Sequence, residues 1–349
     1  MLPLILLLLF AFAFPQKVYV VERERGSVAV IADGKLKKEI GGLGNTNHAT
    51  LKFYRNYAYV VSRDGYLSQI DTSSDILLKK VRVGKSTIGF TFCSDGIAVA
   101  NYSPHTVVLL SPDLKVLKTI RTGSRNVGIK AHGRLLIFSL MDMDEIWAVD
   151  CLDFKKVKVV HEAGSMPFDA LLSGNRYIVG FFKESSAGIL NLKDMSYRKV
   201  SFGEKGGQVV FKIPHFGLWG VYENRAYIPA VGDRRLHVVD LDSFRYITSV
   251  ELPGLPVFVS VSPDGRYLGV NYSGDKEDFF TLIDRRTLRV LETKRLGRRI
   301  LHFRFSPDGR FVYISSYYEN KLKKISIPDL KVLEEIAVPT PSGVFIKGG

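Results

Sequence analysis

One histidine in a glycine-rich loop is the residue of this sequence best suited to bind a flat ligand. His48 lies in the stretch GGLGNTNHATLKF, residues 41–53, and a hydrophobic run follows it directly. A neutral imidazole is a common ligand of haem iron, and Gly41, Gly42 and Gly44 have no side chains to obstruct a macrocycle. A histidine hydrogen-bonded within its own loop is the alternative. The residues alone give the two interpretations equal weight.

Five further polar residues are candidates for positions around the same ligand. Arg63 and Arg125 can hold carboxylates through paired N–H donors, although a surface arginine is the commoner role. His215 and His302 are candidates for a second ligand or for acid–base chemistry. Asp142, in the acidic run MDMDE, either orients a water or a histidine or is a solvated turn residue.

The composition favours an anionic ligand. The 349 residues are 46% hydrophobic, enough for a sizeable core, and 49 Lys and Arg against 35 Asp and Glu give a net charge of +14. Such a charge attracts nucleic acid, membrane surfaces or polycarboxylates. The basic residues are scattered rather than gathered in a stripe, so a basic solvated surface is the simpler interpretation and we expect no nucleic-acid partner.

Several signatures of known chemistry are missing from the sequence. It contains no GxSxG, HExxH or P-loop motif and no GxGxxG after a strand. It also has no CxxC or CxxCH, which argues against a zinc ribbon and against covalently attached c-type haem. The two cysteines, Cys93 and Cys151, either pair in an oxidising compartment or are buried free thiols.

Short apolar strands recur about every 40 residues, a spacing typical of propeller blades. Turns such as SPDG separate them, and Pro followed by Asp-Gly suits a tight β-turn. The sequence therefore predicts an all-β fold, an eight-bladed β-propeller of four-stranded antiparallel blades. The second strands of the eight blades are expected to start at Val18, Ala58, Ile97, Leu135, Tyr177, Ala226, Tyr267 and Phe311.

The two ends of the propeller predict how the ring closes. The run VYVVE from Val18 reads as a second strand, and the terminal PSGVFIKGG reads as a lone first strand. The C-terminal strand would then complete the first blade and remove two free sheet edges. In a propeller the inner strands begin at one rim of the central channel, which places His48 there by analogy of fold. Side chains alternate along a strand, so His302 is expected on the face opposite its neighbours in ILHFRF. A position between two blades is therefore the alternative to a position in the channel.

The N-terminal run predicts export. Residues 2–14, LPLILLLLFAFAF, are too few to span a bilayer, which needs about 20 residues, and fit the core of a secretory signal. We expect residues 1–16 to be a signal peptide and 17–349 to be the propeller, in the periplasm. A buried first strand is the alternative interpretation. No Cys follows the run, so a lipid anchor is not expected.

A set of ordered stretches from about Gly41 to Lys347 carries a family resemblance. They are GLGNTNHAT, VVSRDGYLSQID, SRNVGIKAHGRLLIFSLMDMDEIWAVD, MPFDALL, KIPHFGLWGV, YIPAVGDRRLHVVD, LPVFVSVSPDGRYLGVNYSG, RRILHFRFSPDGRFVYIS and PSGVFIK. With these, the chain resembles the haem d1 biosynthesis proteins of the NirF type. More distantly, it is similar to the d1-haem propeller of cytochrome cd1 nitrite reductase.

The resemblance implies a protein that binds haem d1 or its iron tetrapyrrole precursor, with His48 as the axial iron ligand. It implies that Asp142 and His215 handle protons during a late tailoring step, an oxidation or removal of a macrocycle side chain. It further implies that these residues lie near the tetrapyrrole: Arg63, Arg125, Asp142, His215 and His302. Cytochrome cd1 nitrite reductase and other haem d1 maturation proteins are the implied transient partners. The oligomeric state stays open between a monomer and a homodimer.

The sequence also departs from the reductase. It has no CxxCH for an electron-transfer haem, and the stretches PAVGD and VSVSP lack the distal histidine pair of that family. Nitrite reduction is therefore not expected. Three hypotheses follow: an enzyme acting on a haem d1 precursor, a non-catalytic haem d1 carrier, and a propeller scaffold in which His48 is incidental.

Overall fold

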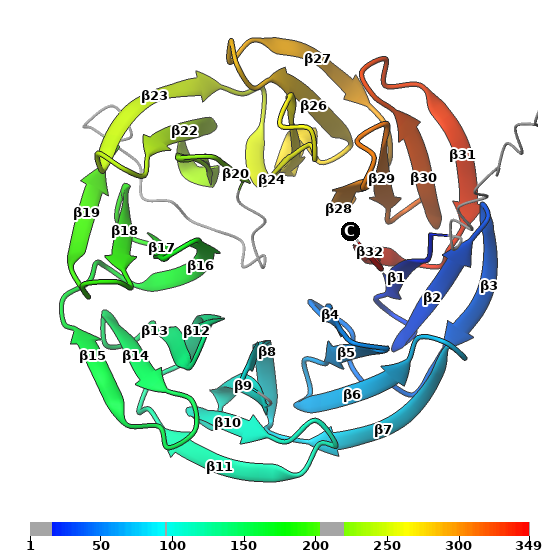
Figure 1. The fold of residues 1–349 in the computed structure, drawn as a ribbon. Coiled ribbons are helices and arrows are strands. Elements are labelled where there is room, and N and C mark those ends of the chain that lie inside the picture. Colours follow the sequence, from blue (N-terminus) through cyan, green and yellow to red (C-terminus); the bar gives the residue numbers. More distant parts are fainter. Residues whose placement is uncertain (1–15, 95, 203–219, 349) are drawn as a thin grey trace, which may run out of the picture.

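The fold is a closed ring of eight four-stranded antiparallel sheets (Figure 1). The computed structural model describes residues 16–94, 96–202 and 220–348. The described part is built from β-strands joined by short turns, with two short 3-10 turns, η2 (Val231–Asp233) and η3 (Gly274–Lys276). The predicted eight-bladed propeller is thus confirmed. Among these residues, no helix has the length and apolar character needed to cross a membrane.

Each blade runs from an inner strand at the channel to an outer strand at the circumference. The inner strands are β4 (Thr50–Tyr54), β8 (Ser86–Cys93), β12 (Asn126–His132), β16 (Pro167–Ser173), β20 (Gly220–Tyr222), β24 (Leu255–Val261), β28 (Ile300–Phe305) and β32 (Pro341–Ile346). The second strands are β1 (Val18–Glu22), β5 (Tyr57–Val61), β9 (Gly96–Ser103), β13 (Leu135–Leu140), β17 (Arg176–Phe181), β21 (Arg225–Ala230), β25 (Tyr267–Ser273) and β29 (Phe311–Ser316).

The outer half of each blade consists of a buried third strand and a more exposed fourth strand. The third strands are β2 (Ser27–Ala32), β6 (Tyr66–Asp71), β10 (Thr106–Leu110), β14 (Glu145–Asp150), β18 (Ser186–Asn191), β22 (Arg235–Asp240), β26 (Phe279–Asp284) and β30 (Lys321–Ser326). The fourth strands are β3 (Lys35–Ile40), β7 (Ile76–Arg82), β11 (Val116–Arg121), β15 (Lys156–Val160), β19 (Tyr197–Ser201), β23 (Arg245–Glu251), β27 (Val290–Arg295) and β31 (Val332–Ala337).

The core lies between neighbouring blades. Second and third strands are apolar on both faces, because each face packs against an adjacent blade. Tyr59 and Leu67 of one blade, for example, share a cluster with Phe90 and Val99 of the next. The outer strands carry charged residues where they meet solvent, as in β3 with its sequence KLKKEI. This burial gradient from sheet centre to edge explains why the second strands were the clearest signal in the sequence.

The C-terminal strand closes the ring as predicted. β32 pairs antiparallel with β1, with Val18 opposite Ile346 and Val20 opposite Val344. The first blade therefore has the order β3-β2-β1-β32, and chain segments more than 300 residues apart share one sheet. This pairing satisfies the edge of β1 that would otherwise stay open.

A disulfide joins two neighbouring blades. Cys93 ends β8, and Cys151 follows β14 in the next blade along the chain. The sequence left this pair undecided between a disulfide and two free thiols. The blade arrangement decides it, because it brings the two residues, 58 positions apart, to a Cα–Cα separation of 6.3 Å, within the usual range for a disulfide.

Bulges interrupt the inner strands where they approach the channel. In β28, residues 301 and 302 both stand opposite Ser315, and in β16, residues 168 and 169 both stand opposite Gly180. A bulge adds one residue to one strand and redirects its side chains. The strands whose pairing shifts in this way are β8, β12, β16, β24, β28 and β32.

Candidate functional site

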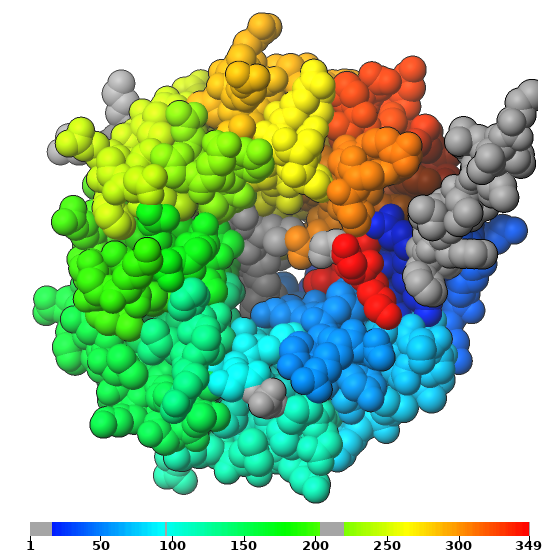
Figure 2. All heavy atoms as spheres, viewed as in Figure 1, coloured from blue at the N-terminus to red at the C-terminus, as the bar shows by residue number. Residues whose placement is uncertain are grey.

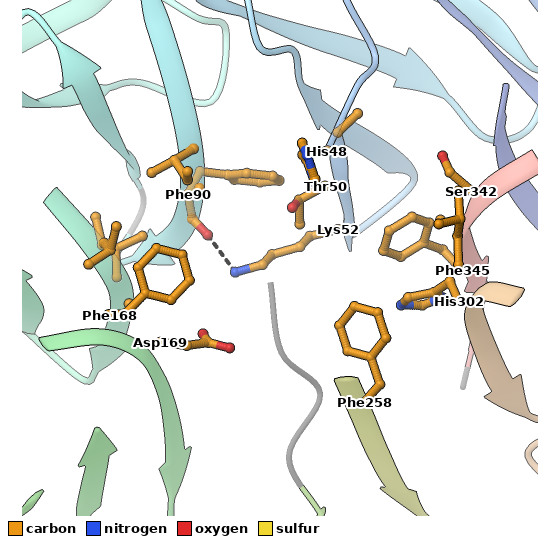
Figure 3. A pocket seen from close by; sticks show the side chains of 18 of the residues that line it. His48, Thr50, Lys52, Phe90, Phe168, Asp169, Phe258, His302, Ser342 and Phe345 are labelled. Atoms are coloured by element: carbon orange, nitrogen blue, oxygen red, sulfur yellow. Dashed lines mark hydrogen bonds between the residues drawn. The ribbon is translucent and has the colours of Figure 1, made fainter. Parts of the chain in front are cut away.

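A cavity occupies the central channel, and the inner strands of several blades line it. The space-filling view shows the ring hollowed at its centre (Figure 2), and a close view shows side chains converging there from different sides (Figure 3). The described residues that line the cavity include Arg23, His48, Lys52, Phe90, Lys130, Phe168, Asp169, Phe258, His302, Arg304, Ser342 and Phe345. Many of them, including Asp169 and His302, occupy bulges.

His48 stands at the mouth of this cavity, as the sequence predicted for its strand. It precedes β4 and has a positive φ of 60°, an uncommon conformation that histidine tolerates better than most residues. Burial, together with the charges of Arg23 and Arg63, lowers the pKa of His48 to about 4. The imidazole is therefore neutral at physiological pH, which is the state that ligates a metal. His48 also lines a smaller neighbouring cavity with Arg23 and Arg299.

The glycines before His48 have a different role from the one we expected. A Cβ on Gly44, whose φ is +90°, would lie 2.7 Å from the Asp64 carboxylate, which accepts a hydrogen bond from the backbone N–H of Asn45. A Cβ on Gly42, whose φ is +77°, would meet the Leu77 side chain at 3.7 Å, whereas Gly41 has open space beside it. The expected clearance for a macrocycle is therefore wrong for Gly44, which makes room for the carboxylate that holds this loop.

His302 lines the cavity because of the bulge in β28. Its Nδ1 accepts a hydrogen bond of 3.0 Å from the backbone N–H of Val344. In the neutral imidazole the proton is then on Nε2, which makes His302 a hydrogen-bond donor. The ring centroid lies 5.3 Å from that of Phe258 and 5.7 Å from that of Phe345. His302 therefore lies in the channel and is not confined between two blades. The bulge explains this, because it breaks the simple alternation of side chains along β28.

Arg63, Arg125 and Asp142 form a group on the rim, outside the set that lines the cavity. Asp142 accepts hydrogen bonds from the backbone N–H of Arg125 at 2.9 Å and from its Nε at 3.0 Å. These bonds lower the pKa of Asp142 to about 2. Arg63 lies over the Tyr102 ring at 5.0 Å. Burial raises the pKa of Tyr102 while Arg63 and Arg125 lower it, so both arginines adjoin this ring.

At neutral pH the carboxylate of Asp142 is consequently ionised and hydrogen-bonded to Arg125. It orients Arg125 through a bidentate contact, and Ser124 donates to its carboxylate as well. The other residue expected to handle protons, His215, lies outside the described residues.

Five charged residues that line the channel were not anticipated from the sequence, namely Arg23, Lys52, Lys130, Asp169 and Arg304. Lys52, on β4, points across the cavity and donates a hydrogen bond to the backbone carbonyl of Phe90 (Figure 3). Lys130 and Asp169 come from β12 and β16, and Arg304 from β28. Lys52 was within reach of sequence reasoning, because alternation along β4 puts Thr50 and Lys52 on one face. Asp169 was not, since it lies in a bulge.

The charges of the cavity do not balance among the described residues. Four cations, Arg23, Lys52, Lys130 and Arg304, line it against one acidic side chain, Asp169. Burial of positive charge without compensation is unfavourable. Arg23 also has a buried Nε without a hydrogen-bond acceptor among these residues, and its nearest carboxylate, that of Glu24, is 3.7 Å away.

These residues fit an iron tetrapyrrole that carries carboxylates. The neutral imidazole of His48 would supply an iron ligand, the cations would supply partners for carboxylates, and the aromatic rings would supply apolar faces for a flat ring system. The aromatic residues that line the cavity are Phe90, Phe168, Phe258 and Phe345. No group of three or more potential metal-ligating side chains occurs in the part of the chain that the structure describes, so a bare-ion centre has no support there.

Comparison with known proteins identifies the family. A family described as cytochrome D1 heme domain matches residues 15–348. The chain therefore belongs to the cytochrome D1 haem domain family. Protein NirF of Pseudomonas aeruginosa is 34% identical to it, over 93% of this chain and 89% of that protein. Protein NirF of Stutzerimonas stutzeri is 31% identical, over 93% and 90%. Within the family, the chain is a NirF-like haem d1 biosynthesis protein.

A solved structure agrees with this fold. Dihydro-heme d1 dehydrogenase NirN in complex with DHE superimposes with a TM-score of 0.78, covering 94% of this chain and 74% of that one, at 19% sequence identity. The predicted resemblance is thus confirmed at the level of family, and the comparisons support a role in haem d1 biosynthesis or handling.

Proposed function

We propose that this protein binds a d1-type haem, or its tetrapyrrole precursor, in the central channel and that His48 is its axial iron ligand. The observation that carries this proposal is a half-buried, neutral imidazole that lines a cavity with a basic and aromatic lining. Its membership of the cytochrome D1 haem domain family supports the same ligand.

The residues of the chain would bind, orient and shield this ligand. When bound, the tetrapyrrole supplies an iron with axial coordination positions and a rim of carboxylates. His48 would bind the iron, and Arg23, whose buried Nε has no hydrogen-bond partner among the described residues, would bind a carboxylate. His302 presents its Nε2 proton as a fixed donor, since its Nδ1 is occupied by the Val344 N–H. The phenylalanines exclude water from the ring faces.

We further propose that the protein takes part in a late tailoring step on the macrocycle. The step would be an oxidation of a side chain, with electrons passing to an external acceptor, or the removal of a side chain. Asp142 would act by holding Arg125 toward the ligand as well as by any proton handling, because its carboxylate is already engaged. His215 keeps its expected role as a proton handler. Incubation with precursor and an electron acceptor should change the mass of the tetrapyrrole.

The periplasm is the proposed compartment. The Cys93–Cys151 disulfide supports it, because disulfides persist in oxidising compartments, and so does the apolar N-terminal run expected to act as a signal. Cytochrome cd1 nitrite reductase and other haem d1 maturation proteins are the proposed transient partners, and a homodimer remains a proposal. A tagged chain recovered from the cytoplasmic fraction alone would contradict this localisation.

A non-catalytic haem d1 carrier is the second candidate, favoured by the engaged state of Asp142. The variants Asp142→Asn and His215→Ala separate the two functions. Loss of haem d1 maturation with unchanged ligand affinity would make a pure carrier untenable. An unchanged tetrapyrrole mass under every redox condition, with tight binding retained, would instead reject the tailoring step.

An absorption titration with haem d1 tests binding itself. We expect a shifted Soret band for the natural protein, its loss in His48→Ala, and its retention in His105→Ala, a control at an exposed histidine that does not line the cavity. Identical spectra for the natural protein and His48→Ala would contradict His48 as ligand. Absence of any spectral change would leave the propeller as a scaffold for a protein partner.

A further inference from the structure

Two lysines of the channel come from the blades on either side of the β8 blade, and neither has a carboxylate partner among the described residues. Lys52 comes from β4, and Lys130 comes from β12. The β8 strand between them contributes Phe90, whose carbonyl accepts one proton of Lys52 and whose ring centroid lies 5.2 Å from the Lys52 Nζ. An ammonium group has three donors. This wall of the channel therefore presents two cations with donors still to satisfy.

The described residues around the two lysines do not supply the missing negative charge. Among the described residues, neither lysine forms an ion pair, and Lys130 forms no hydrogen bond through its ammonium group. Asp169 acts electrostatically on Lys130 but cannot balance both lysines and Arg304 as well. The charged and titratable groups that face this region are Arg23, His48, Lys130, Asp169, His302 and Arg304.

We propose that Lys52 and Lys130 form a carboxylate subsite on the channel wall, which receives one acidic side chain of the tetrapyrrole and selects macrocycles that retain it. This inference rests on the proposed function and adds a specificity element separate from the iron ligand. A carboxylate held between two ammonium groups forms charge-assisted hydrogen bonds in a region of low dielectric. Those bonds would also relieve the repulsion between the lysines.

The subsite couples ligand binding to proton uptake. Burial, with the nearby charge of Lys130, lowers the pKa of Lys52 to about 7, so above pH 7 the amine is largely neutral in the ligand-free protein. A bound carboxylate raises that pKa, since it favours the charged form. Binding above pH 7 therefore takes up a proton, and the affinity for a carboxylated ligand falls as the pH rises above about 7.

The test measures the affinities of the variants Lys52→Met and Lys130→Met for haem d1 and for its methyl ester. The variant Lys118→Met is the control. Lys118 lies exposed on the outer strand β11, so its replacement changes the net charge equally. We expect each channel variant to bind haem d1 about 10- to 100-fold more weakly. The control should change affinity by less than about twofold. The natural protein should prefer haem d1 to its ester, and both channel variants should lose much of that preference.

Two further readouts keep the proposal separable from the function it rests on. Calorimetry at pH 8 in buffers of different ionisation enthalpy should show an uptake of between about half a proton and one by the natural protein, lost in Lys52→Met. Without ligand, Lys52→Met should melt no lower than the natural protein below pH 7, where it removes a desolvated charge that has no carboxylate partner among the described residues.

An intact Soret shift that depends on His48, together with unchanged affinity, ester preference and proton uptake in Lys52→Met, would overturn the subsite alone. No binding of haem d1 by the natural protein would overturn the proposed function and the subsite together.

Discussion

The rim and the interior of the channel both carry arginine or lysine, but these cations are paired with a carboxylate on the rim and, among the described residues, largely unpaired in the interior. On the rim, Arg125 and Asp142 neutralise each other, and their side chains are 37% and 36% exposed. In the interior, Lys52 and Lys130 have no carboxylate partner among the described residues. The rim pair is therefore complete without a ligand and serves to orient groups. The interior cations need an anion to balance their charge. For this reason the interior, and not the rim, indicates that the protein binds an anionic ligand.

The largest expected effect concerns the disulfide between the two blades that carry Phe90 and Lys130. The disulfide connects the blade of β8 to the blade of β12, so Cys93→Ser combined with Cys151→Ser should lower the free energy of unfolding by about 2–4 kcal/mol. Denaturant unfolding of the double variant measures this. Reduction of the natural protein should have the same effect, and an unchanged midpoint in both would contradict a structural role for the bond.

A second prediction makes the interior resemble the rim. Thr50 lines the cavity between His48 and Lys52, so Thr50→Glu would supply an internal carboxylate. Because like charges repel at close range, we expect the affinity for haem d1 to fall by about 100-fold. Thr50→Gln is the control of equal size, and it should retain most of the affinity. Equal losses in the two variants would show that size, and not charge, governs binding here.

A third prediction removes the rim pair. Asp142→Asn should lower the free energy of unfolding at pH 7 by about 0.2–1 kcal/mol, the usual value for an exposed ion pair. The pKa of Asp142 is depressed to about 2, so its contribution is present above pH 4 and is lost as the pH falls from about 4 to 2. The natural protein and the variant should therefore converge in stability at low pH. A difference that persists at pH 2 would contradict the pairing.

The effect that is smallest at pH 7 concerns the ligand-free imidazole, because it appears only at acidic pH. Because the pKa of His48 is lowered to about 4, the unfolded chain binds a proton at this position between pH 6.5 and 4 that the folded chain does not. Stability should therefore fall as the pH falls through that window, and His48→Gln should reduce the slope. An NMR titration that places the pKa of His48 near 6.5 would contradict the half-buried, neutral state.

Sequence reasoning reached the fold and the place of His48 beside the channel more easily than the rest of the channel lining. Second strands such as VYVVE are apolar on both faces, and this pattern recurs, so eight blades and the closing C-terminal strand could be predicted. His48 was accessible because it directly precedes an inner strand. Asp169 lies in a bulge, where alternation no longer indicates which face a residue occupies. The rim contact of Asp142 with Arg125 was equally out of reach, since it joins two loops 17 residues apart.

The most direct test of the central claim, that His48 ligates the iron of a tetrapyrrole in the channel, is ligand rescue. Haem d1 is added to His48→Gly, and the ferric complex is followed by absorption and electron paramagnetic resonance before and after addition of imidazole. We predict that the variant lacks the nitrogen-ligated spectrum of the natural protein and regains it with imidazole, because the free ring fills the space of the missing side chain. A nitrogen-ligated spectrum in His48→Gly without imidazole would contradict the account.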